Sequence, residues 1–420
     1  RAITFLERQP EVDASKLGFS GFSMGGMITA LTATDPRLKA VVPFVGGTGF
    51  KHIDFPGGVQ GSSIRVHFKD VELYRKTIDA SAYWPRVKCP VMFISSSNDF
   101  HSVFDRIYQS MALLKHSNWR VTTNMHQNHG PGPEQWVLLN LWFDQYLNGT
   151  EQSIPVTPPS TLTVSDDSAI FTVTPENRTR LSETEIYFSY DPNGRTRFWN
   201  RADAEQKGAS WTVQLPVHEN LPLYVFALCR YTLPQSIQLE REKTSTFTLN
   251  SVEQLLVPDT VKLEQLSQLP KTRVVFEDFR NGARDWSSRD QRSIKTYKFQ
   301  SPDLARPNSN HLSFHINPQG KRLALRLNAG SKFLNQQDNL GDFSYTTTID
   351  GNQPQEFEIS REDFKSTSGK TLEWSKIATF EITLIDRDSN QKIDLTSKAG
   401  QALIESIQLK PNTPQINKNN

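Results

Sequence analysis

Hydrophobic and polar positions divide the chain into two parts with different patterns. Up to about residue 149, short continuous apolar runs alternate with segments in which apolar residues recur at helical spacing. The apolar runs are typical of strands buried on both faces and predict strands at residues 17–21, 38–45, 90–94 and 119–125. The other segments predict helices at residues 1–9, 25–34, 102–115 and 133–147. Such regular alternation favours a parallel sheet that is covered by helices on both faces.

The ends of the predicted helices carry residues that are typical of helix termini. Pro10 follows the first helix. Ser102 and Asp105 have the spacing of a capping box. Pro133 falls in the first turn of the last helix, and Gly149 falls just past its end. In that helix we expect an inward apolar face, widened by Leu138 and Trp142, that consists of Trp136, Val137, Leu141, Phe143 and Leu147.

Beyond a Pro-rich linker at residues 152–160, the helical pattern gives way to short strands. Strands are predicted at residues 186–188, 210–217, 224–228 and 246–249, and in a further block at residues 274–276, 312–316, 323–327, 357–359, 378–386 and 403–409. Trp211, Val213 and Leu215 alternate with polar residues, as in a strand with one buried face. We therefore expect an α/β domain at residues 1–150, β-sandwich domains at 160–258 and 270–412, and a disordered tail at 413–420.

The composition argues against nucleic acid and membranes as partners. The 420 residues carry a formal net charge of +2 without a run of Lys and Arg, so the charge that would hold a phosphate backbone is absent. No apolar stretch approaches the ~18 residues that a membrane span needs. No group of His, Asp and Glu has metal-ligand spacing, and we expect neither a metal nor another cofactor. Cys89 and Cys229 fall in separate predicted domains and are expected to be free, buried thiols.

The first residues of the chain are typical of the interior of a domain. Residue 1 is Arg rather than Met, and residues 1–9 already form a helical pattern. We therefore expect that an N-terminal part of the α/β domain, with strands of its sheet, lies upstream of this sequence. Targeting signals would lie in that part as well.

The sequence Gly21-Phe22-Ser23-Met24-Gly25-Gly26 joins a predicted strand to a predicted helix. A serine flanked by glycines at such a turn is the nucleophile elbow of α/β-hydrolases. The serine is strained there, and a side chain at Gly21 or Gly25 would collide with the neighbouring strand or helix. The N–H of Met24 is expected to donate to an oxyanion at the helix N-terminus. A second donor is expected from a loop upstream of this sequence.

A serine nucleophile needs a base, and the base needs an acid to orient it. The strand predicted at residues 90–94 leads to Asp99, and the strand predicted at residues 119–125 leads to His129. Both residues fall at carboxyl ends of parallel strands, where open α/β sheets place their ligand sites. The chain order Ser23, Asp99, His129 is that of α/β-hydrolases, and we predict these three as the catalytic residues.

Alternative roles for these side chains stay open at this point. Asp99 could instead cap the helix predicted at residues 102–115. His126 and His101 compete with His129, which we prefer because the following residues 130–132 (Gly-Pro-Gly) suit an exposed loop. We expect surface positions for the other histidines of this region, which are His52, His67 and His116.

The first 230 or so residues resemble a bacterial serine-hydrolase family related to acetyl xylan esterases, dienelactone hydrolases and prolyl-oligopeptidase-like enzymes. The resemblance rests on residues 6–13 ahead of the Ser23 turn, Ala82-Tyr83-Trp84 ahead of residues 90–94, Asn98-Asp99-Phe100-His101, and Asn128-His129 followed by Pro133-Glu134-Gln135. It implies an α/β-hydrolase fold with Ser23 as nucleophile, Asp99 as acid and His129 as base. It further implies a β-sandwich behind the hydrolase domain, on residues 197–199, 210–211 and 222–227, and a periplasmic or secreted location.

Residues 270–412 resemble a galactose-binding-type jelly roll. The resemblance rests on residues 276–279 (Phe-Glu-Asp-Phe) and on residues 372–377 before a strand that ends in Asp386. Such modules often bind carbohydrate by stacking a sugar on an exposed aromatic ring. Trp286 and Trp374 are candidates for this stacking, although a place in the core is the more common role of such residues.

Together the resemblances imply a hydrolase that cleaves a carboxylic ester, as acetyl esterases do, through an acyl-enzyme. Its partner would be an ester substrate, with a polysaccharide as one candidate. Two alternatives stay open. A serine peptidase of the prolyl-oligopeptidase type would use the same three residues, whereas a non-catalytic glycan-binding protein would keep only a vestigial hydrolase domain.

Overall fold

The chain folds into two compact units. The computed structural model describes residues 1–62, 69–150, 154–165, 167–176, 178–240, 242–273, 275–288, 292–304, 310–334, 336–366 and 368–411. Residues Arg1–Arg195 and Trp199–Leu263 form the first unit, and residues Thr196–Phe198 and Glu264–Asn420 form the second. Val274 of a predicted strand, His67, residues 152–153 of the predicted linker and the predicted tail at 413–420 lie outside the described residues.

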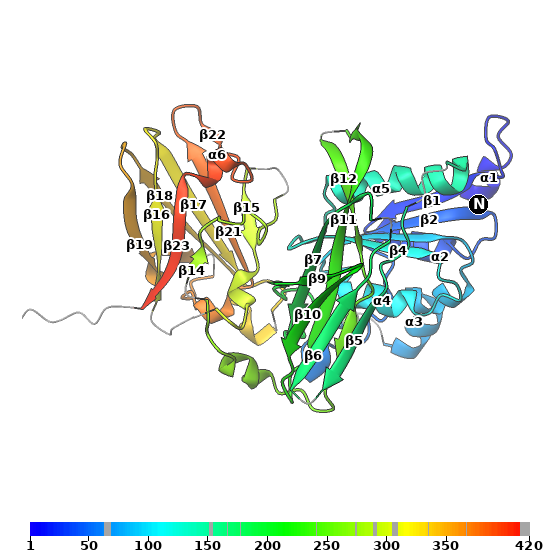
Figure 1. Ribbon diagram of the computed structural model, residues 1–420, viewed down its shortest axis with the longest axis horizontal. Coiled ribbons are helices and arrows are strands. Elements are labelled where there is room, and N and C mark those ends of the chain that lie inside the picture. The colour runs from blue at the N-terminus through cyan, green and yellow to red at the C-terminus, as the bar shows by residue number, and fades with distance from the viewer. Residues whose placement is uncertain are drawn as a thin grey trace, which may run out of the picture. The chain divides into compact units, whose positions relative to one another are not determined.

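The first unit begins with the parallel sheet that the sequence predicts. Its strands are β1 (Leu17–Phe22), β2 (Leu38–Phe44), β3 (Val91–Ser96) and β4 (Trp119–Asn124), hydrogen-bonded in that order. Every residue of β3 is buried, as its continuous apolar run predicted. Figure 1 shows α5 on one side of this sheet and α2 and α4 on the other, so the prediction of helices on both faces is confirmed.

The four predicted helices of this region are present, although not always at the predicted length, and a further helix lies at residues 71–77, where the sequence predicted none. They are α1 (Ala2–Leu6), α2 (Met24–Thr32), α3 (Val71–Thr77), α4 (Phe104–Met111) and α5 (Pro133–Phe143), with 3₁₀ turns at Pro56–Gly58, Ala80–Ala82 and Trp84–Arg86. The helix predicted at residues 1–9 is wrong in extent, because α1 has five residues. Among the described residues, every helix is too short or too polar to cross a membrane.

The predicted capping box at the start of α4 is wrong. The helix begins at Phe104, after Val103, and no side chain caps it. The N–H of Ser102 instead donates to Asp99 Oδ1 (2.6 Å), which keeps residue 102 in the preceding turn. The Asp99 turn, rather than a serine cap, therefore sets where α4 starts.

Helix α5 has the predicted ends but a different buried face. Pro133 is its first residue, and a π-helical turn (Asp144–Asn148) continues it to Gly149, which has φ 67°. Leu138 and Trp142 are fully buried, whereas Trp136 is 37% exposed instead of facing inward. The helix buries two sides, because Gln135 bonds Thr248 of a β-sandwich (2.8 Å) and a β-carbon at Gly18 would lie only 2.8 Å from the Phe143 ring.

A predicted β-sandwich completes the first unit. Its strands are β5 (Ser160–Ser165), β6 (Ser168–Val173), β7 (Leu181–Ser189), β8 (Asn200–Ala202), β9 (Glu205–Lys207), β10 (Ser210–Pro216), β11 (Leu223–Gln238), β12 (Lys243–Asn250) and β13 (Gln254–Leu256). They form two antiparallel sheets, β5-β6-β10-β9 and β12-β11-β7-β8, and β13 pairs with β11. Val213 and Leu215 of β10 are buried, in line with the predicted alternation.

The β-sandwich and the α/β region share one core. Phe104 of α4 packs on Phe226 of β11 (ring centroids 4.7 Å apart) and on Trp199 (5.3 Å). Asn250 of β12 donates to Thr123 of β4 (2.8 Å). Apolar packing and polar contacts therefore join these two parts of the first unit along their common boundary.

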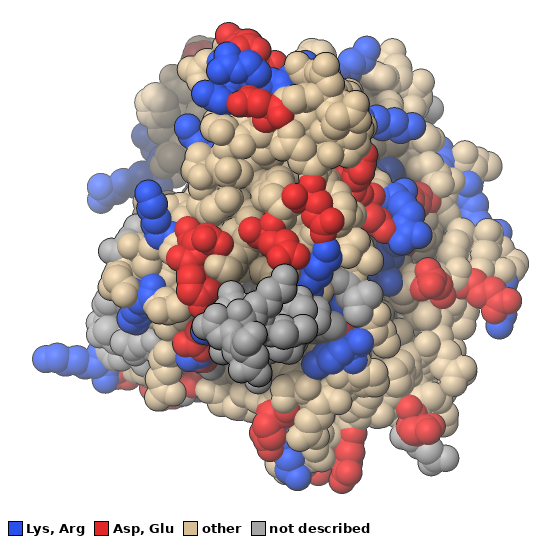
Figure 2. Space-filling model, turned by 90° about the vertical axis from the view of Figure 1, so that its left-hand side faces the viewer, with Lys and Arg blue, Asp and Glu red and all other residues tan. Residues whose placement is uncertain are grey.

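The second unit consists of antiparallel sheets, as expected. Its elements are β14 (Val275–Glu277), β15 (Ile294–Thr296), β16 (Asn310–Ile316), β17 (Leu323–Gly330), β18 (Asp342–Ile349), β19 (Gln355–Ser360), β20 (Lys365–Ser366), β21 (Thr379–Asp386), β22 (Gln391–Lys392), α6 (Lys398–Gln401) and β23 (Ile404–Pro411). One sheet has the order β14-β23-β16-β19 and the other β15-β21-β17-β18-β20, with β22 beside β21. Short 3₁₀ turns lie at Leu263–Gln268, Lys298–Gln300, Gln336–Asp338, Arg361–Asp363 and Trp374–Lys376. On the face in Figure 2, Lys and Arg are interspersed with Asp and Glu, and the coloured residues form no continuous basic field.

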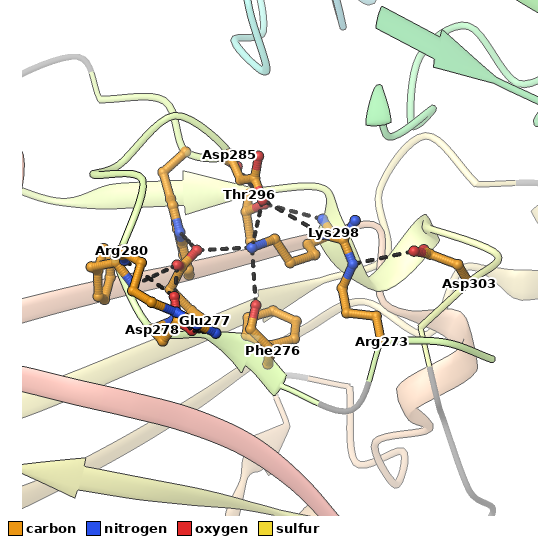
Figure 3. A network of polar contacts seen from close by, with 11 residues as sticks. Arg273, Phe276, Glu277, Asp278, Arg280, Asp285, Thr296, Lys298 and Asp303 are labelled. Carbon is orange, nitrogen blue, oxygen red and sulfur yellow. Dashed lines mark hydrogen bonds and ion pairs between the residues drawn. The ribbon is translucent and has the colours of Figure 1, made fainter. Parts of the chain in front are cut away.

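A buried lysine organises one end of the second unit (Figure 3). Lys298 is 2% exposed, and its Nζ atom contacts the main-chain oxygen of Phe276 (2.9 Å), Glu277 Oε2 (2.8 Å) and Asp285 Oδ2 (2.8 Å). Trp286 donates to the same Glu277 oxygen (2.6 Å). Trp286 and Trp374 are 6% and 5% exposed, so both candidates for sugar stacking belong to the core.

Both cysteines are buried free thiols, which confirms the prediction from the sequence. Burial raises the pKa of Cys89 to about 11 and that of Cys229 to about 12. The thiols therefore stay protonated at neutral pH, and protonated thiols are poor nucleophiles and metal ligands.

Candidate active site

The turn between β1 and α2 holds Ser23 in a backbone conformation that side chains rarely adopt. Ser23 has φ 56° and ψ −110°. Its N–H donates to the main-chain oxygen of Phe44 on the neighbouring strand (2.9 Å), and its carbonyl accepts from Met27 in the helix (3.2 Å). The serine is thus fixed between a strand and a helix, in a conformation that costs about 1–3 kcal/mol and that the surrounding bonds maintain.

The glycines around Ser23 differ in what they do. A β-carbon at Gly21 would collide with the carbonyl of Gly25, as the sequence predicted. The prediction for Gly25 is wrong, because a β-carbon there would meet no atom within 4 Å. Gly46, after β2, adds a constraint that the sequence did not indicate, since a β-carbon there would collide with the carbonyl of Ser23.

The structure brings the three predicted catalytic residues into one hydrogen-bonded line. Ser23 Oγ lies 2.8 Å from His129 Nε2, and His129 Nδ1 lies 3.0 Å from Asp99 Oδ2. Asp99 has no exposed surface, and 16% of the His129 side chain is exposed. The three residues follow β1, β3 and β4, so the carboxyl end of the sheet gathers them at one place.

The second oxygen of Asp99 fixes the carboxylate. Asp99 Oδ1 accepts from the N–H groups of His101 (2.7 Å) and Ser102 (2.6 Å). One carboxylate therefore holds its own turn and also faces His129. The sequence allowed two roles for Asp99, as a helix cap or as the partner of a histidine. Asp99 does not cap α4, because that helix starts only at Phe104, and its Oδ1 atom holds the preceding turn instead.

The other candidate histidines have other hydrogen-bond partners, although the His101 ring also lies edge-on to the His129 ring (centroids 6.1 Å apart). His126 is fully buried, its N–H donates to Ser97 Oγ (2.7 Å), and its ring contacts Tyr187 edge-on (6.3 Å). His101 lies beside Lys51 rather than Ser23, with Lys51 Nζ 3.1 Å from its Nε2 atom. The surface position expected for His52 is wrong, since its side chain is 13% exposed and lies 3.8 Å from Asp79.

Lys51 is a buried cation beside His101 that the sequence did not indicate. It is 5% exposed, and burial lowers its pKa to about 8. Burial and the Lys51 charge together lower the pKa of His101 to about 4, which keeps that ring neutral. Asp79 holds the loop, because its carboxylate accepts from the N–H groups of Phe50 (3.0 Å) and Lys51 (3.3 Å). A lone lysine in an irregular segment carried no signal of this placement.

Aromatic rings surround His129. Phe100 lies 4.7 Å from its ring and Phe22 5.5 Å, while Trp136 stacks between Phe22 (6.2 Å) and Phe44 (4.7 Å). Phe22, Phe100 and Trp136 are each more than a third exposed. An apolar, partly open surface therefore adjoins the imidazole, as an apolar substrate group would require.

Met24 is the first residue of α2, directly after Ser23. N–H groups in the first turn of a helix have no partner within the helix, and the helix dipole adds a partial positive charge there. The Met24 side chain is exposed, at 73% of its surface. Donation from the Met24 N–H to an oxyanion on a Ser23 adduct stays a prediction.

Comparison with known proteins finds hydrolases that are similar to parts of this chain. Residues 1–130 match the model of the dienelactone hydrolase family. A Rhodopirellula baltica protein named as an Xaa-Pro dipeptidyl-peptidase is 23% identical over 182 residues, which are 34% of this chain and 29% of that protein. The chain thus matches less than a third of that relative's length.

The TM-scores against solved structures are low and close to one another. The acylaminoacyl peptidase of Pyrococcus horikoshii is 20% identical over 36% of this chain and 27% of its own, with a TM-score of 0.29. Acetyl xylan esterase 1 from Thermoanaerobacterium is 17% identical over 34% of this chain and 49% of its own, with a TM-score of 0.28. A CocE/NonD family hydrolase from Staphylococcus aureus is 9% identical over 97% of this chain and 72% of its own, with a TM-score of 0.29.

The family match and the parallel sheet agree with the sequence-based resemblance. The N-terminal region, of which residues 1–130 match the dienelactone hydrolase family, is α/β-hydrolase-like, and antiparallel sheets follow it.

Proposed function

We propose that this protein is a serine hydrolase that cleaves a carboxylic ester through an acyl-enzyme on Ser23. The observation that carries the proposal is the unbroken hydrogen-bonded line from Ser23 Oγ through the His129 ring to Asp99 (2.8 and 3.0 Å). A nucleophile, a base and an orienting acid at such distances are the parts that acyl transfer needs.

The first half of the reaction forms the acyl-enzyme. Ser23 Oγ attacks the ester carbonyl carbon while His129 Nε2 takes the hydroxyl proton. The carbonyl electron pair moves to oxygen, where the Met24 N–H donates to the oxyanion. When that pair returns, the C–O bond to the alcohol breaks, and His129 gives its proton to the leaving oxygen. Asp99 keeps Nδ1 protonated and stabilises the imidazolium.

The second half regenerates the enzyme. A water molecule attacks the acyl carbon, and His129 takes one of its protons. The new oxyanion collapses, the bond from carbon to Ser23 Oγ breaks, and His129 returns the proton to Ser23. The products are a carboxylic acid and an alcohol.

A serine peptidase is the second candidate. The same residues would cleave an amide, and the proteins similar to this chain include an Xaa-Pro dipeptidyl-peptidase by name and an acylaminoacyl peptidase. To separate the two, kcat/KM would be compared for p-nitrophenyl acetate and aminoacyl-p-nitroanilides. We expect the ester to be preferred even after correction for its higher intrinsic reactivity. Efficient anilide cleavage with slow ester turnover would favour the peptidase.

A polysaccharide stays a candidate substrate only because the second unit resembles a carbohydrate-binding module. Neither Trp286 nor Trp374 serves as the stacking residue for a sugar, because both are buried. Retarded migration in polysaccharide gels would support glycan binding. Binding without any esterase activity would instead favour the non-catalytic alternative. The periplasmic or secreted location implied by the resemblance remains a prediction, for which fractionation of the source cells is the test.

A further inference from the structure

The loop that carries Asp99 is tied to the β-sandwich on both sides of that residue. Asn98 Nδ2 donates to the main-chain oxygen of Arg195 (3.4 Å). In the opposite direction, Arg195 Nε donates to the main-chain oxygen of Phe100 (3.3 Å). Arg195 lies between β7 and β8 of the sandwich, within the first unit. One sandwich residue therefore bonds to both neighbours of Asp99.

The segment that presents Arg195 is itself firmly held. Asp191 accepts from the N–H of Asn193 (2.8 Å), and Asn193 accepts from the N–H of Arg195 (3.2 Å). Gly194 packs so closely on the start of α4 that a β-carbon there would lie 2.8 Å from Val103 Cγ1. Side-chain caps and close packing thus fix where the Arg195 main chain stands.

The Arg195 guanidinium also bonds to a second loop. Its two terminal nitrogens donate to the main-chain oxygens of Gln60 (3.1 Å) and Gly61 (2.8 Å). The guanidinium carbon also lies 5.7 Å from the Phe55 ring centroid. A planar fork with several donors is needed to reach three carbonyls at once, which a lysine ammonium on a flexible stem cannot do in the same geometry.

We propose that Arg195 is a positioning residue for the hydrolase reaction, which makes the β-sandwich a working part of the active site. The proposal rests on the proposed function. By holding Phe100 and the turn around Asp99, Arg195 keeps the Asp99 carboxylate aligned with His129 and keeps the Phe100 ring against the imidazole (4.7 Å).

The test compares Arg195→Lys and Arg195→Ala with the parent chain in p-nitrophenyl acetate hydrolysis. We expect kcat to fall by about 10- to 100-fold, because small misplacements of catalytic groups have effects of that size. KM should stay near its parent value, and the lysine variant should lose less than the alanine variant. Arg180→Lys and Arg180→Ala are matched controls. Arg180 belongs to the same sandwich, donates to the main-chain oxygen of Thr232 (3.1 Å) and lies over the Phe247 ring (5.5 Å).

Melting temperatures and Ser23 labelling by a fluorophosphonate decide between the outcomes. If Arg195→Lys loses kcat but keeps the melting temperature of the parent chain, the proposal is supported, even if Arg195→Ala folds poorly. Parent kcat in the Arg195 variants, or an equal loss in the Arg180 controls, would overturn it while leaving the proposed function intact. A parent chain without Ser23-dependent labelling or turnover would overturn both.

Discussion

Two glycines beside Ser23 have opposite surroundings, which permits a matched pair of substitutions. Gly21→Ala should destabilise the chain by about 1–3 kcal/mol, as overpacking does, because its β-carbon collides with the carbonyl of Gly25. Gly25→Ala should be neutral or slightly stabilising, by up to about 1 kcal/mol, because its β-carbon meets open space in a helix. Urea denaturation measures both, and equal losses would contradict this account of the turn.

For single residues, the sequence was informative where side-chain chemistry and order along the chain point to the same positions. Ser23, Asp99 and His129 could be predicted because a motif, the order of residues and the ends of strands all point to them. Lys51 and Gly46 could not, because their places depend on contacts between segments that no local pattern encodes. Gly46, for example, is required only because the carbonyl of Ser23 lies against it.

Helix α5 offers a test of its corrected buried face. Leu138 is fully buried and Leu141 is half-buried, although the sequence pattern put Leu141 on the main inward face. Leu138→Ala should therefore cost about 2–5 kcal/mol of unfolding free energy, the range for buried leucines. Leu141→Ala should cost clearly less. A larger loss for Leu141→Ala would return α5 to the face that the sequence predicted.

Elements were predictable where their ends carry strong local signals. Pro133 and Gly149 mark α5 correctly, because proline suits a first turn and glycine accepts a positive φ. The predicted starts and ends failed at residues 1–9 and at residue 102. At residue 102, a bond from Ser102 to Asp99 outweighs the expected serine cap.

At the scale of the molecule, Lys298 and Lys295 of the second unit can be compared by the unfolding free energy that is lost when each is replaced. Lys298→Met leaves Glu277 and Asp285 without their buried ammonium, and losing one partner of a buried pair costs about 3–5 kcal/mol. Lys295 forms a half-buried pair with Glu381 (3.2 Å), and pairs near the surface are worth about 0–1 kcal/mol. Lys295→Met should therefore change the unfolding free energy little.

Denaturation of both variants, followed by Ser23 labelling under native conditions, is the measurement. We expect labelling to be unchanged in each, because the Ser23 line lies in the first unit. Equal unfolding losses for the two lysines would contradict the structural role assigned to Lys298.

The change from an α/β region to β-sheets could be predicted from periodicity alone, since helical and strand patterns differ in spacing. The shared core of the first unit could not. That Phe104 packs on Trp199 and Phe226 depends on which surfaces meet, and residues far apart in sequence carry no local sign of it. For the same reason, a role for Arg195 beside Asp99 emerges only from the folded chain.

Mass spectrometry after reaction with a fluorophosphonate, on the parent chain beside Ser23→Ala, His129→Ala and Asp99→Asn, tests whether Ser23 is a nucleophile that His129 and Asp99 activate. The account predicts one adduct on Ser23 in the parent, none in Ser23→Ala, and labelling at least about 10²-fold slower without His129 or with an amide at Asp99, as for removal of a base or of its orienting acid. An adduct that persists in Ser23→Ala, or labelling at the parent rate without His129, would contradict it.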